Sequence, residues 1–363
     1  MTAIVAARRT PVAPRGGAFA ALQPHDLAAP VIRAALADAG LPPGAVGEVI
    51  AANALGAGGN PARVAALAAG LPQTVAGLSI DRQCAGGLDA LLLADAMIRA
   101  GLHEVVIAGG VESYSRRPIR LRTHLDGRPP EAYDQAPFTP WPDRDPDMAE
   151  AANRLASLQG IHRAEQDAWA QASHARARVV AAPGLVPLAG LETDAFTRDL
   201  TPRACARAPV VHGTITAANM AVAADGAAFV VMVSDRMAQR LGLPAVRLSA
   251  GATLGDTPDL PGLAPVAAIR AALARAGLSV ADLDRAEIME AFAVQAIACQ
   301  RGADLDPRIV NPDGGALARG HPVGASGAIL AVALFHRLRG TGQTGLAAIA
   351  AAGGIGTAAV LRG

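Results

Sequence analysis

The chain has 363 residues, of which 52% are apolar and 17% charged, so it can bury a large core and is too long for one ordinary domain. Its formal net charge of +1 argues against a surface for nucleic acid or for an acidic membrane. All 32 basic residues are arginine, which excludes Schiff-base lysine chemistry, lysine-anchored pyridoxal phosphate and the P-loop lysine.

The N-terminal residues MTAIVAARRTPVAP have no apolar segment after the basic pair, so they do not form a secretory signal. The longest apolar stretch, residues 346–361, is rich in glycine and too short to span a membrane. The three cysteines lie far apart, which is typical of a reducing compartment. We therefore expect a cytoplasmic protein that contacts neither membrane nor nucleic acid.

The first third of the chain alternates helix and strand patterns. A helical segment IRAALADAGL (32–41) precedes the strand-like EVIAANA (48–54). A second apolar run (74–80) leads to Cys84, which opens a glycine-rich turn before a long apolar helix. The strand-like VVIAGG (105–110) follows. This order predicts a parallel or mixed sheet covered by helices.

Residues 116–214 differ in composition, with clusters of proline and charge around one amphipathic helical stretch. Trp169, Leu155 and Leu158 give this stretch apolar surface to bury, so we interpret it as an inserted loop domain rather than a linker. The apolar strand GAAFVVMVSD (226–235) then completes the first half of the chain.

The last third repeats the first. IRAALARAGL (269–278) matches residues 32–41 at nine of ten positions, at an offset of 237. The same offset carries Cys84 onto His321, which also opens a glycine-rich turn before a long apolar helix. A strand-like run ending in a glycine pair, LAAIAAAGG (346–354), follows as in the first half. This internal duplication predicts two α/β halves related by a pseudo-two-fold axis.

We therefore predict three units: residues 1–115 with 215–243 as the first half, 116–214 as the insert, and 244–363 as the second half. Cys84 and His321 occupy equivalent places in the two halves, so they approach each other near the axis. Nothing local in the sequence brings them together otherwise.

Cys84 directly precedes a helix, where free backbone N–H groups and the helix dipole favour thiolate and lower the thiol pKa. Gly86 and Gly87 permit close approach of a substrate to the backbone. A lone cysteine at such a junction is also compatible with a small buried core residue. His321 is open to the same ambiguity, as a capping or surface histidine. The symmetric pairing of the two favours a nucleophile and its base.

Two further features accompany this pair. Glu290 and Phe292 lie in the segment MEAFA (289–293), and a glycine run, GGIG, occupies 353–356. The run is either a packing device for close backbones or a source of oxyanion-binding N–H groups. Gly324 and Gly327 clear space on the helix that follows His321.

Taken together, these segments resemble the thiolase family, of the acetyl-CoA acetyltransferase and 3-ketoacyl-CoA thiolase type. The resemblance covers nearly the whole chain and keeps the family's motif order: ARRTPV (7–12), DRQCAGGLDAL (81–91), GGVES (109–113), AEAAN (149–153), EQDAWA (165–170), GTITAAN (213–219), MEAFA (289–293), NPDGGALARGHPVGASG (311–327) and GGIG (353–356).

The resemblance implies a thiolase-like fold of two duplicated βαβαβαββ halves, five-stranded, with a loop domain inserted in the first. It also implies a homodimer or homotetramer, acyl-CoA substrates, and no cofactor or metal. Because the chain lacks lysine, arginines in the insert are expected to meet any nucleotide phosphate.

By position in the motifs, Cys84 resembles the acylated nucleophile and His321 the histidine that activates it. The backbone N–H groups of Cys84 and Ala352 correspond to an oxyanion site, and Gly324, Gly353 and Gly354 to active-site glycines. Two positions depart from the family. Met289 stands where the family has an asparagine that orients a water, and Ala350 stands where it has the acid/base cysteine. Cys205 and Cys299 match no family catalytic position.

Three functional hypotheses remain. The first is an acyltransferase that acylates Cys84 from an acyl-CoA or a carrier-bound thioester, with a modified acceptor step. The second is an authentic thiolase whose acid/base has been relocated. The third is a non-catalytic thiolase-like subunit that binds a thioester or scaffolds a partner enzyme.

Overall fold

In the computed structural model, residues 2–56, 58–180 and 182–363 are described. Nine strands form one continuous sheet in the order β12-β13-β14-β11-β1-β10-β5-β3-β4, and β2 (Ala13–Pro14) pairs beside β10. The strands are β1 (Thr2–Arg9), β3 (Glu48–Ala52), β4 (Ala76–Ile80), β5 (Val105–Glu112), β10 (Ala224–Ser234), β11 (Val246–Gly255), β12 (Arg285–Ile288), β13 (Thr344–Ala351) and β14 (Ile355–Arg362).

The sheet repeats one pattern twice. In each half an antiparallel trio, β1-β10-β5 or β11-β14-β13, continues into a parallel strand, β3 or β12. The halves join where the start of β1 pairs antiparallel with the start of β11. The strand-like segments of the sequence therefore become strands in the predicted places.

The second half is one strand shorter than the family resemblance implies. β4 pairs with β3 in the first half, but its counterpart is a single parallel bridge between Ala286 and Val310. The surrounding residues cannot extend the ladder, because Pro307 and Pro312 lack an N–H and Asn311 has a left-handed backbone (φ 44°).

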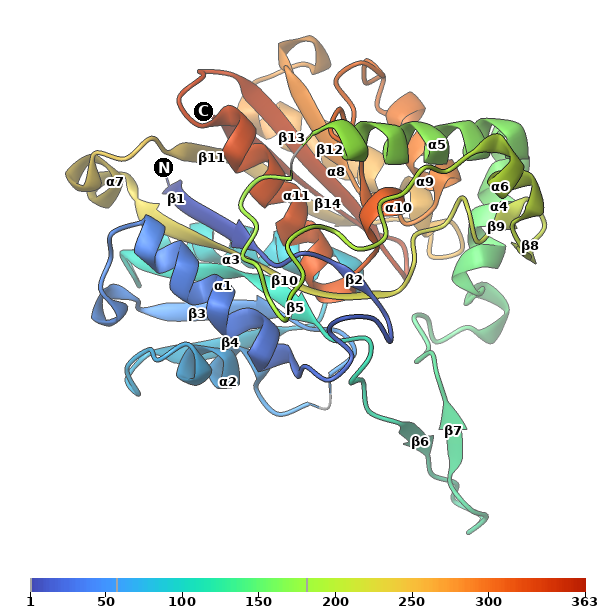
Figure 1. The fold of residues 1–363 in the computed structure, drawn as a ribbon, viewed down its shortest axis with the longest axis horizontal. Helices are drawn as coiled ribbons and strands as arrows, with labels where there is room; N and C mark the ends of the chain where they lie inside the picture. The colour runs from blue at the N-terminus through green and yellow to red at the C-terminus, as the bar shows by residue number, and fades with distance from the viewer. Residues whose placement is uncertain (1, 57, 181) are drawn as a thin grey trace.

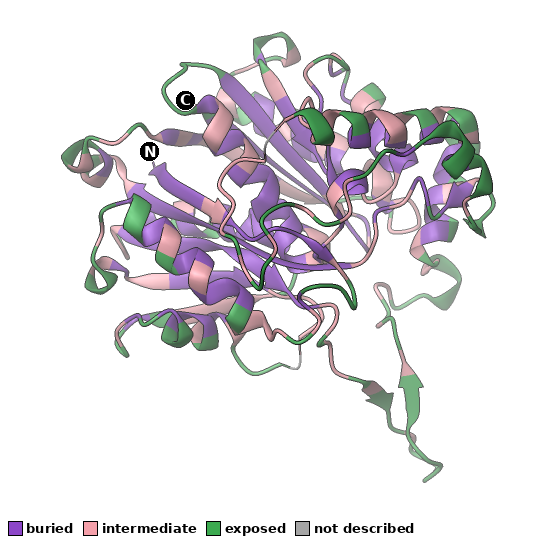
Figure 2. Ribbon diagram, viewed as in Figure 1, coloured by how far each residue is buried: buried purple, intermediate pink, exposed green. Residues whose placement is uncertain are grey.

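Helices cover both halves and also separate them. α3 (Gly86–Arg99) and α11 (Val323–Leu338) pack together in the central apolar cluster, between residues of both sheet halves, and α11 passes through the middle of Figure 1. α1 (Pro24–Asp38) and α2 (Pro61–Ala68) cover the outer face of the first half, and α8 (Ala264–Ala276) that of the second. α11 is apolar on all sides, which is why it is buried (purple in Figure 2).

The segment between β5 and β10 lies at one end of this core. A hairpin of β6 (Arg120–Arg122) and β7 (Glu131–Tyr133) projects from the body in Figure 1. The rest comprises η3 (Pro142–Arg144), α4 (Met148–Gln159), α5 (Arg163–Val179), α6 (Pro202–Arg207), β8 (Val210–His212) and β9 (Ile215–Thr216).

The apolar residues expected to bury surface in this segment differ in how far they are buried. Leu155 is buried, and Trp169 packs against one apolar cluster of the second half and two that this segment shares with the second half. Leu158 is 60% exposed, so its expected burial is wrong: it lies in the last turn of α4, beyond the buried residues of that helix.

The remaining elements connect these layers: η1 (Pro43–Ala45), η2 (Gln83–Ala85), α7 (Asp235–Leu241), η4 (Pro261–Leu263), η5 (Val280–Asp282), α9 (Ala293–Gly302) and α10 (Ala316–Arg319). Among the described residues, no helix has the length and apolar character needed to cross a membrane.

Candidate active site

Cys84 lies in η2, the short 3-10 turn between β4 and α3. Its neighbour Gln83 has a left-handed backbone (φ 47°) and donates its N–H to the Asp81 carboxylate at 2.8 Å. The helix after the cysteine begins at Gly86. This tight turn presents the thiol in front of α3.

His321 lies between α10 and α11, directly after Gly320, whose φ of 108° favours glycine. The backbone N–H of His321 donates to the carbonyl of Val222 at 2.8 Å. This bond ties the turn to the segment that leads into β10, and so fixes where the imidazole can point.

The two side chains meet, although 237 positions separate them. His321 Nε2 lies 3.1 Å from Cys84 Sγ, within hydrogen-bond distance for sulfur. On the other side of the ring, Nδ1 lies 2.6 Å from Ser326 Oγ. The Ser326 hydroxyl donates its one proton to the carbonyl of Pro322 at 2.9 Å, so it accepts from Nδ1–H. The proton-free Nε2 therefore faces the thiol.

Burial favours the neutral form of both groups. Burial raises the pKa of the Cys84 thiol to about 12; a backbone hydrogen bond lowers it, and Glu112 and Asp81 add to the rise. The expectation that the helix start lowers this pKa is therefore wrong, because desolvation outweighs the N–H donors. Burial also lowers the pKa of His321 to about 4. The imidazole can thus accept the thiol proton as Sγ attacks.

The carboxylate of Glu112 connects three segments of the chain next to the site. It is fully buried and accepts from the N–H groups of Ala54 and Leu55, the amide of Asn53, and the N–H of Gly324. These bonds tie the end of β5 to the loop after β3 and to the first turn of α11. Burial raises the pKa of this carboxyl to about 7, against the effect of its donors.

A cavity of about 700 Å³ opens in front of the Cys84–His321 pair. Ala350 and Ala352 both line it. At Ala350 the side chain is a methyl group and offers no proton donor or acceptor.

Met289 does not belong to this wall. It is 1% exposed, packs in the central apolar cluster, and is absent from the described residues lining the cavity. Its N–H donates to the carbonyl of Ala348, which places it in the layer of β12 and β13. The resemblance implies an asparagine amide at this position. The structure instead has the apolar side chain of Met289, which is buried in the core.

The three predicted active-site glycines are also absent from the described lining residues. Gly324 sits where a Cβ would lie 2.8 Å from the carbonyl oxygen of Ala52, so it lets α11 approach β3. Gly353 and Gly354 have φ values of 76° and 75° and form the turn between β13 and β14. Their positions fit the packing alternative for the glycine run.

Glu290 and Phe292 have different environments. Glu290 is buried and accepts from Trp169, Ser173, Asn311 and the N–H of Leu317, so it joins α5 to the loop before His321. Phe292 lines the cavity. Cys205 and Cys299 are both buried and do not appear among the described lining residues.

Several lining residues carry no sequence signal of their own, among them Arg15, Tyr114, Arg117, Met220 and Gln295. Ser326 is the clearest omission, because it lies in the GHPVGASG segment five residues after His321. A small hydroxyl residue at this spacing after a candidate histidine is the sequence signal that could have identified it as the partner of the imidazole.

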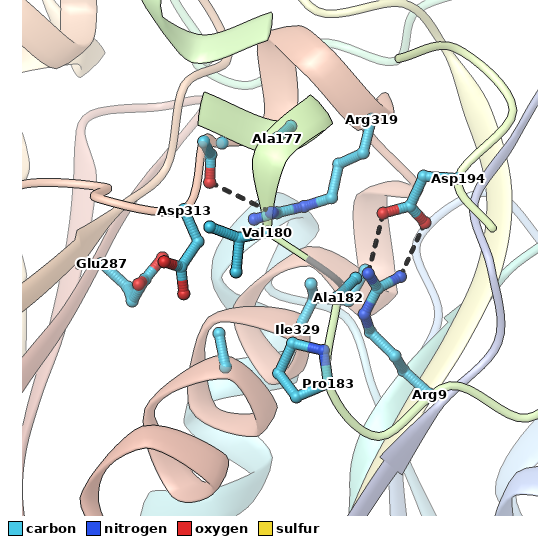
Figure 3. Close-up of a pocket in the computed structure, with 13 residues that line it drawn as sticks. Arg9, Ala177, Val180, Ala182, Pro183, Asp194, Glu287, Asp313, Arg319 and Ile329 are labelled. Carbon is cyan, nitrogen blue, oxygen red and sulfur yellow. Dashed lines mark hydrogen bonds and ion pairs between the residues drawn. The ribbon is translucent and has the colours of Figure 1, made fainter. Parts of the chain in front are cut away.

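Figure 3 shows a second cavity, of about 40 Å³, beside α10. Arg9 makes two bonds to Asp194, at 2.8 and 2.7 Å, and Arg319 reaches the carbonyl of Gly314 at 3.4 Å. Glu287 and Asp313 line its other side. It holds room for one or two waters and no nucleophile, so we assign it to structure rather than chemistry.

Comparisons with known proteins agree along the whole chain. Residues 2–236 match the model of the thiolase N-terminal domain, and residues 243–363 that of the thiolase C-terminal domain. The chain is 41% identical over 372 residues to the YhfS protein of Bacillus subtilis strain 168, covering 98% of this chain and 97% of that one.

It is also 38% identical over 385 residues to an acetyl-CoA acetyltransferase of Pseudomonas aeruginosa PAO1, covering 99% and 98% of the two chains. The crystal structure of the Bacillus anthracis acetyl-CoA acetyltransferase superposes with a TM-score of 0.94 at 34% identity, covering 99% of this chain and 98% of that one. The chain belongs to the thiolase family.

Proposed function

We propose that this protein is an acyltransferase that forms a thioester on Cys84 from an acyl-CoA or a carrier-bound thioester. The 3.1 Å approach of the unprotonated His321 Nε2 to the Cys84 thiol is the observation that carries this proposal. The Pseudomonas aeruginosa and Bacillus anthracis relatives are named acetyl-CoA acetyltransferases, which supports a CoA thioester as donor.

The acylation step moves one proton and exchanges one thioester for another. As Sγ attacks the carbonyl carbon, the thiol proton passes to Nε2. The resulting oxyanion is held by the backbone N–H groups of Cys84 and Ala352. Collapse expels the CoA thiolate, which takes the proton back from Nε2 and leaves Cys84 acylated.

The acceptor is one that needs no proton removed from carbon by the enzyme: water, an amine, or an already acidic carbon. Condensation of two acyl groups needs a base at the α-carbon, and Ala350 supplies none. A missing general base costs about 10²–10⁴-fold in rate, and a missing oxyanion donor about 10²–10³-fold. Met289 is buried in the core and supplies no polar group to the cavity. We therefore expect the rate of ordinary condensation to be lowered.

Intact-mass spectrometry after incubation with acetyl-CoA tests the acyl transfer. We expect one acyl adduct in the wild type and in Cys205→Ala, and none in Cys84→Ala. A wild-type chain that remains unmodified, or an adduct that persists in Cys84→Ala, would overturn the proposal.

The naming of the relatives favours a second candidate, an authentic thiolase with a relocated acid/base. Thiolysis of acetoacetyl-CoA, followed by absorbance, separates the two. We expect slow thiolysis that rises at least tenfold in Ala350→Cys, since the thiol then faces the cavity. Wild-type thiolysis that Ala350→Cys does not improve would favour the second candidate.

A third candidate is a non-catalytic subunit that binds a thioester or scaffolds another enzyme. It predicts that Cys84 never becomes acylated, and that Cys84→Ala leaves the biological role intact. The acyl-adduct experiment therefore separates it from the first two.

A further inference from the structure

Glu112 ends β5 next to the reacting pair, and its carboxylate is completely buried. It is not among the described residues that line the large cavity. The acylation step proposed above gives this carboxylate no role, although a buried charge is costly unless hydrogen bonds satisfy it. Its hydrogen bonds indicate what it contributes.

Four neutral donors occupy both oxygens of this carboxylate. Oε1 accepts from the side-chain amide of Asn53 at 2.8 Å and from the N–H of Leu55 at 3.2 Å. Oε2 accepts from the N–H groups of Ala54 and Gly324, both at 3.0 Å. A carboxylate has about four acceptor sites, so the ionised form satisfies all of these donors. A proton on either oxygen displaces a donor, because the groups around it are themselves donors.

The bond to Gly324 anchors the turn that carries His321. Within that turn, the N–H and the hydroxyl of Ser326 both donate to the carbonyl of Pro322, and the hydroxyl accepts from the imidazole. The N–H of His321 ties one side of the turn to the segment before β10, and the N–H of Gly324 ties the other side to β5. The carboxylate thus anchors the backbone three residues after the reacting imidazole.

The other three bonds anchor the loop after β3. Ala54 and Leu55 line the cavity. The backbone N–H of Asn53 donates to the carbonyl of Ile80 at 3.1 Å, where β4 ends before the Cys84 turn. One carboxylate therefore joins the segment that leads to the thiol with the segment that carries the imidazole.

We propose that Glu112 is a positioning residue for the acylation of Cys84, whose ionised carboxylate holds these segments so that the His321 imidazole faces the thiol. This inference rests on the acyl transfer proposed above and adds to it a residue outside the cavity. Misplacing a reacting group by about 1 Å can cost about 10²-fold in rate. Loss of the Glu112 bonds is therefore expected to slow acylation.

The protonation state of Glu112 provides the readout. Burial raises its pKa to about 7, against its N–H donors, and the charge of Asp81 adds to the rise. The pKa of Cys84 is raised to about 12 and that of His321 is lowered to about 4. Neither reacting group changes its charge between about pH 5.5 and 8.5, so a change in rate over that range comes from another group.

Other charged groups lie around Glu112. Arg120 of β6 donates to the carbonyl of Ala54, and Asp225 precedes the residue of β10 that pairs with Glu112. Burial raises the pKa of Asp225 as well, against hydrogen bonds from Ser115. A fall in rate caused by Asp225, or by the phosphates of the donor, persists when Glu112 is replaced. A fall caused by Glu112 does not.

The maximal rate of Cys84 acylation by acetyl-CoA, followed by intact mass from about pH 5.5 to 8.5, tests the assignment. We expect the wild-type rate to fall about tenfold between about pH 8 and 6, as Glu112 binds a proton. Glu112→Gln, whose amide nitrogen faces two of the donors, acylates at least tenfold more slowly at pH 8 and loses this fall. Glu112→Asp keeps a carboxylate, so it acylates faster than Glu112→Gln and keeps the fall with a shifted midpoint.

Glu48→Gln is the matched control. Burial raises the pKa of Glu48 too, but this residue begins β3 and is not among the described lining residues. It leaves both the rate and its pH dependence unchanged.

A wild-type rate that does not change with pH, or a fall that persists in Glu112→Gln, would overturn the inference and leave acyl transfer standing. If Glu112→Gln does not fold, a midpoint that Glu112→Asp leaves unshifted would overturn it equally. A wild-type chain without an adduct at any pH would overturn acyl transfer, and this inference with it, so the two failures are distinguishable.

Discussion

At the scale of single residues, the Cys84 and His321 side chains are aligned with each other, and burial favours their neutral forms. Ser326 fixes which nitrogen of His321 carries the proton, and burial keeps both the thiol and the imidazole uncharged. Burial disfavours the charged form of each side chain, the thiolate and the imidazolium. This arrangement suits the proposed acylation, in which the thiol proton is transferred during attack rather than before it.

The pH dependence of alkylation follows from this. Because the pKa of Cys84 is raised to about 12, its thiolate fraction keeps rising through the whole alkaline range. We expect the rate of iodoacetamide alkylation to climb about tenfold per pH unit without levelling near 8.5, where a free cysteine levels. A plateau near that value, measured by mass spectrometry on Cys84, would show that the thiol is not desolvated.

Ser326→Ala removes the acceptor of Nδ1–H and frees the tautomer and ring orientation. We expect kcat for acylation of Cys84 to fall about tenfold with little change in KM, since the substrate walls are untouched. Ser326→Thr retains the hydroxyl and restores most of the rate. If Ser326→Ala acylates at the wild-type rate, the hydroxyl does not position His321.

At the scale of elements, the site depends on how closely α3 and α11 approach. Gly87 sits where a Cβ would lie 2.7 Å from the N of Ala328, and Gly327 sits directly against the N of Leu88. Two small residues facing each other let the helix after Cys84 contact the helix after His321. The closeness of the two helices sets the closeness of the two side chains.

Gly327→Ala tests this contact. Alanine favours an isolated helix by about 1 kcal/mol over glycine, but overpacking a tight contact costs about 1–3 kcal/mol. The added methyl would press on backbone, which cannot move aside, so we expect a net loss of stability in urea unfolding and slower acylation. Gly44→Ala, whose Cβ meets open space, serves as the control and changes neither. A stabilised Gly327→Ala would contradict the packing argument.

At the scale of the whole molecule, one charged joint connects three parts of the chain. Arg9 belongs to β1, Asp194 to the segment between α5 and α6, and Arg319 to α10, just before His321. The Arg9 and Asp194 side chains are only 4% and 10% exposed. Burial raises the pKa of Asp194, but Arg9, Arg319 and the N–H of Val12 together lower it below its ordinary value, so the carboxylate stays ionised.

Asp194→Asn leaves the Arg9 guanidinium buried without a counter-charge. We expect it to lose about 3–5 kcal/mol of stability at neutral pH. Since the folded-state pKa of Asp194 lies below the unfolded value, the loss relative to wild type shrinks as the pH falls through that range. The control is Asp306→Asn, in an exposed pair with Arg308, and we expect no measurable change. Equal unfolding midpoints of wild type and Asp194→Asn would show that the Asp194 carboxylate does not stabilise the fold through Arg9.

Local pattern was enough to predict the main repeated helices and strands of the two halves. The spacing of apolar residues gave the helices around Ile32 and Ile269, and the glycine turns before α3 and α11 marked where each long helix begins. The repeat at an offset of 237 placed Cys84 and His321 in equivalent positions, and the motifs indicated the family. Such features depend on neighbours in the chain, and so the sequence carries them directly.

Features that depend on three-dimensional surroundings were decided only by the tertiary structure. Burial reversed the expected direction of the Cys84 pKa shift, and Met289 is buried in the core instead of lining the cavity. Desolvation, packing and hydrogen-bond partners come from residues far apart in the sequence, so no local pattern contains them.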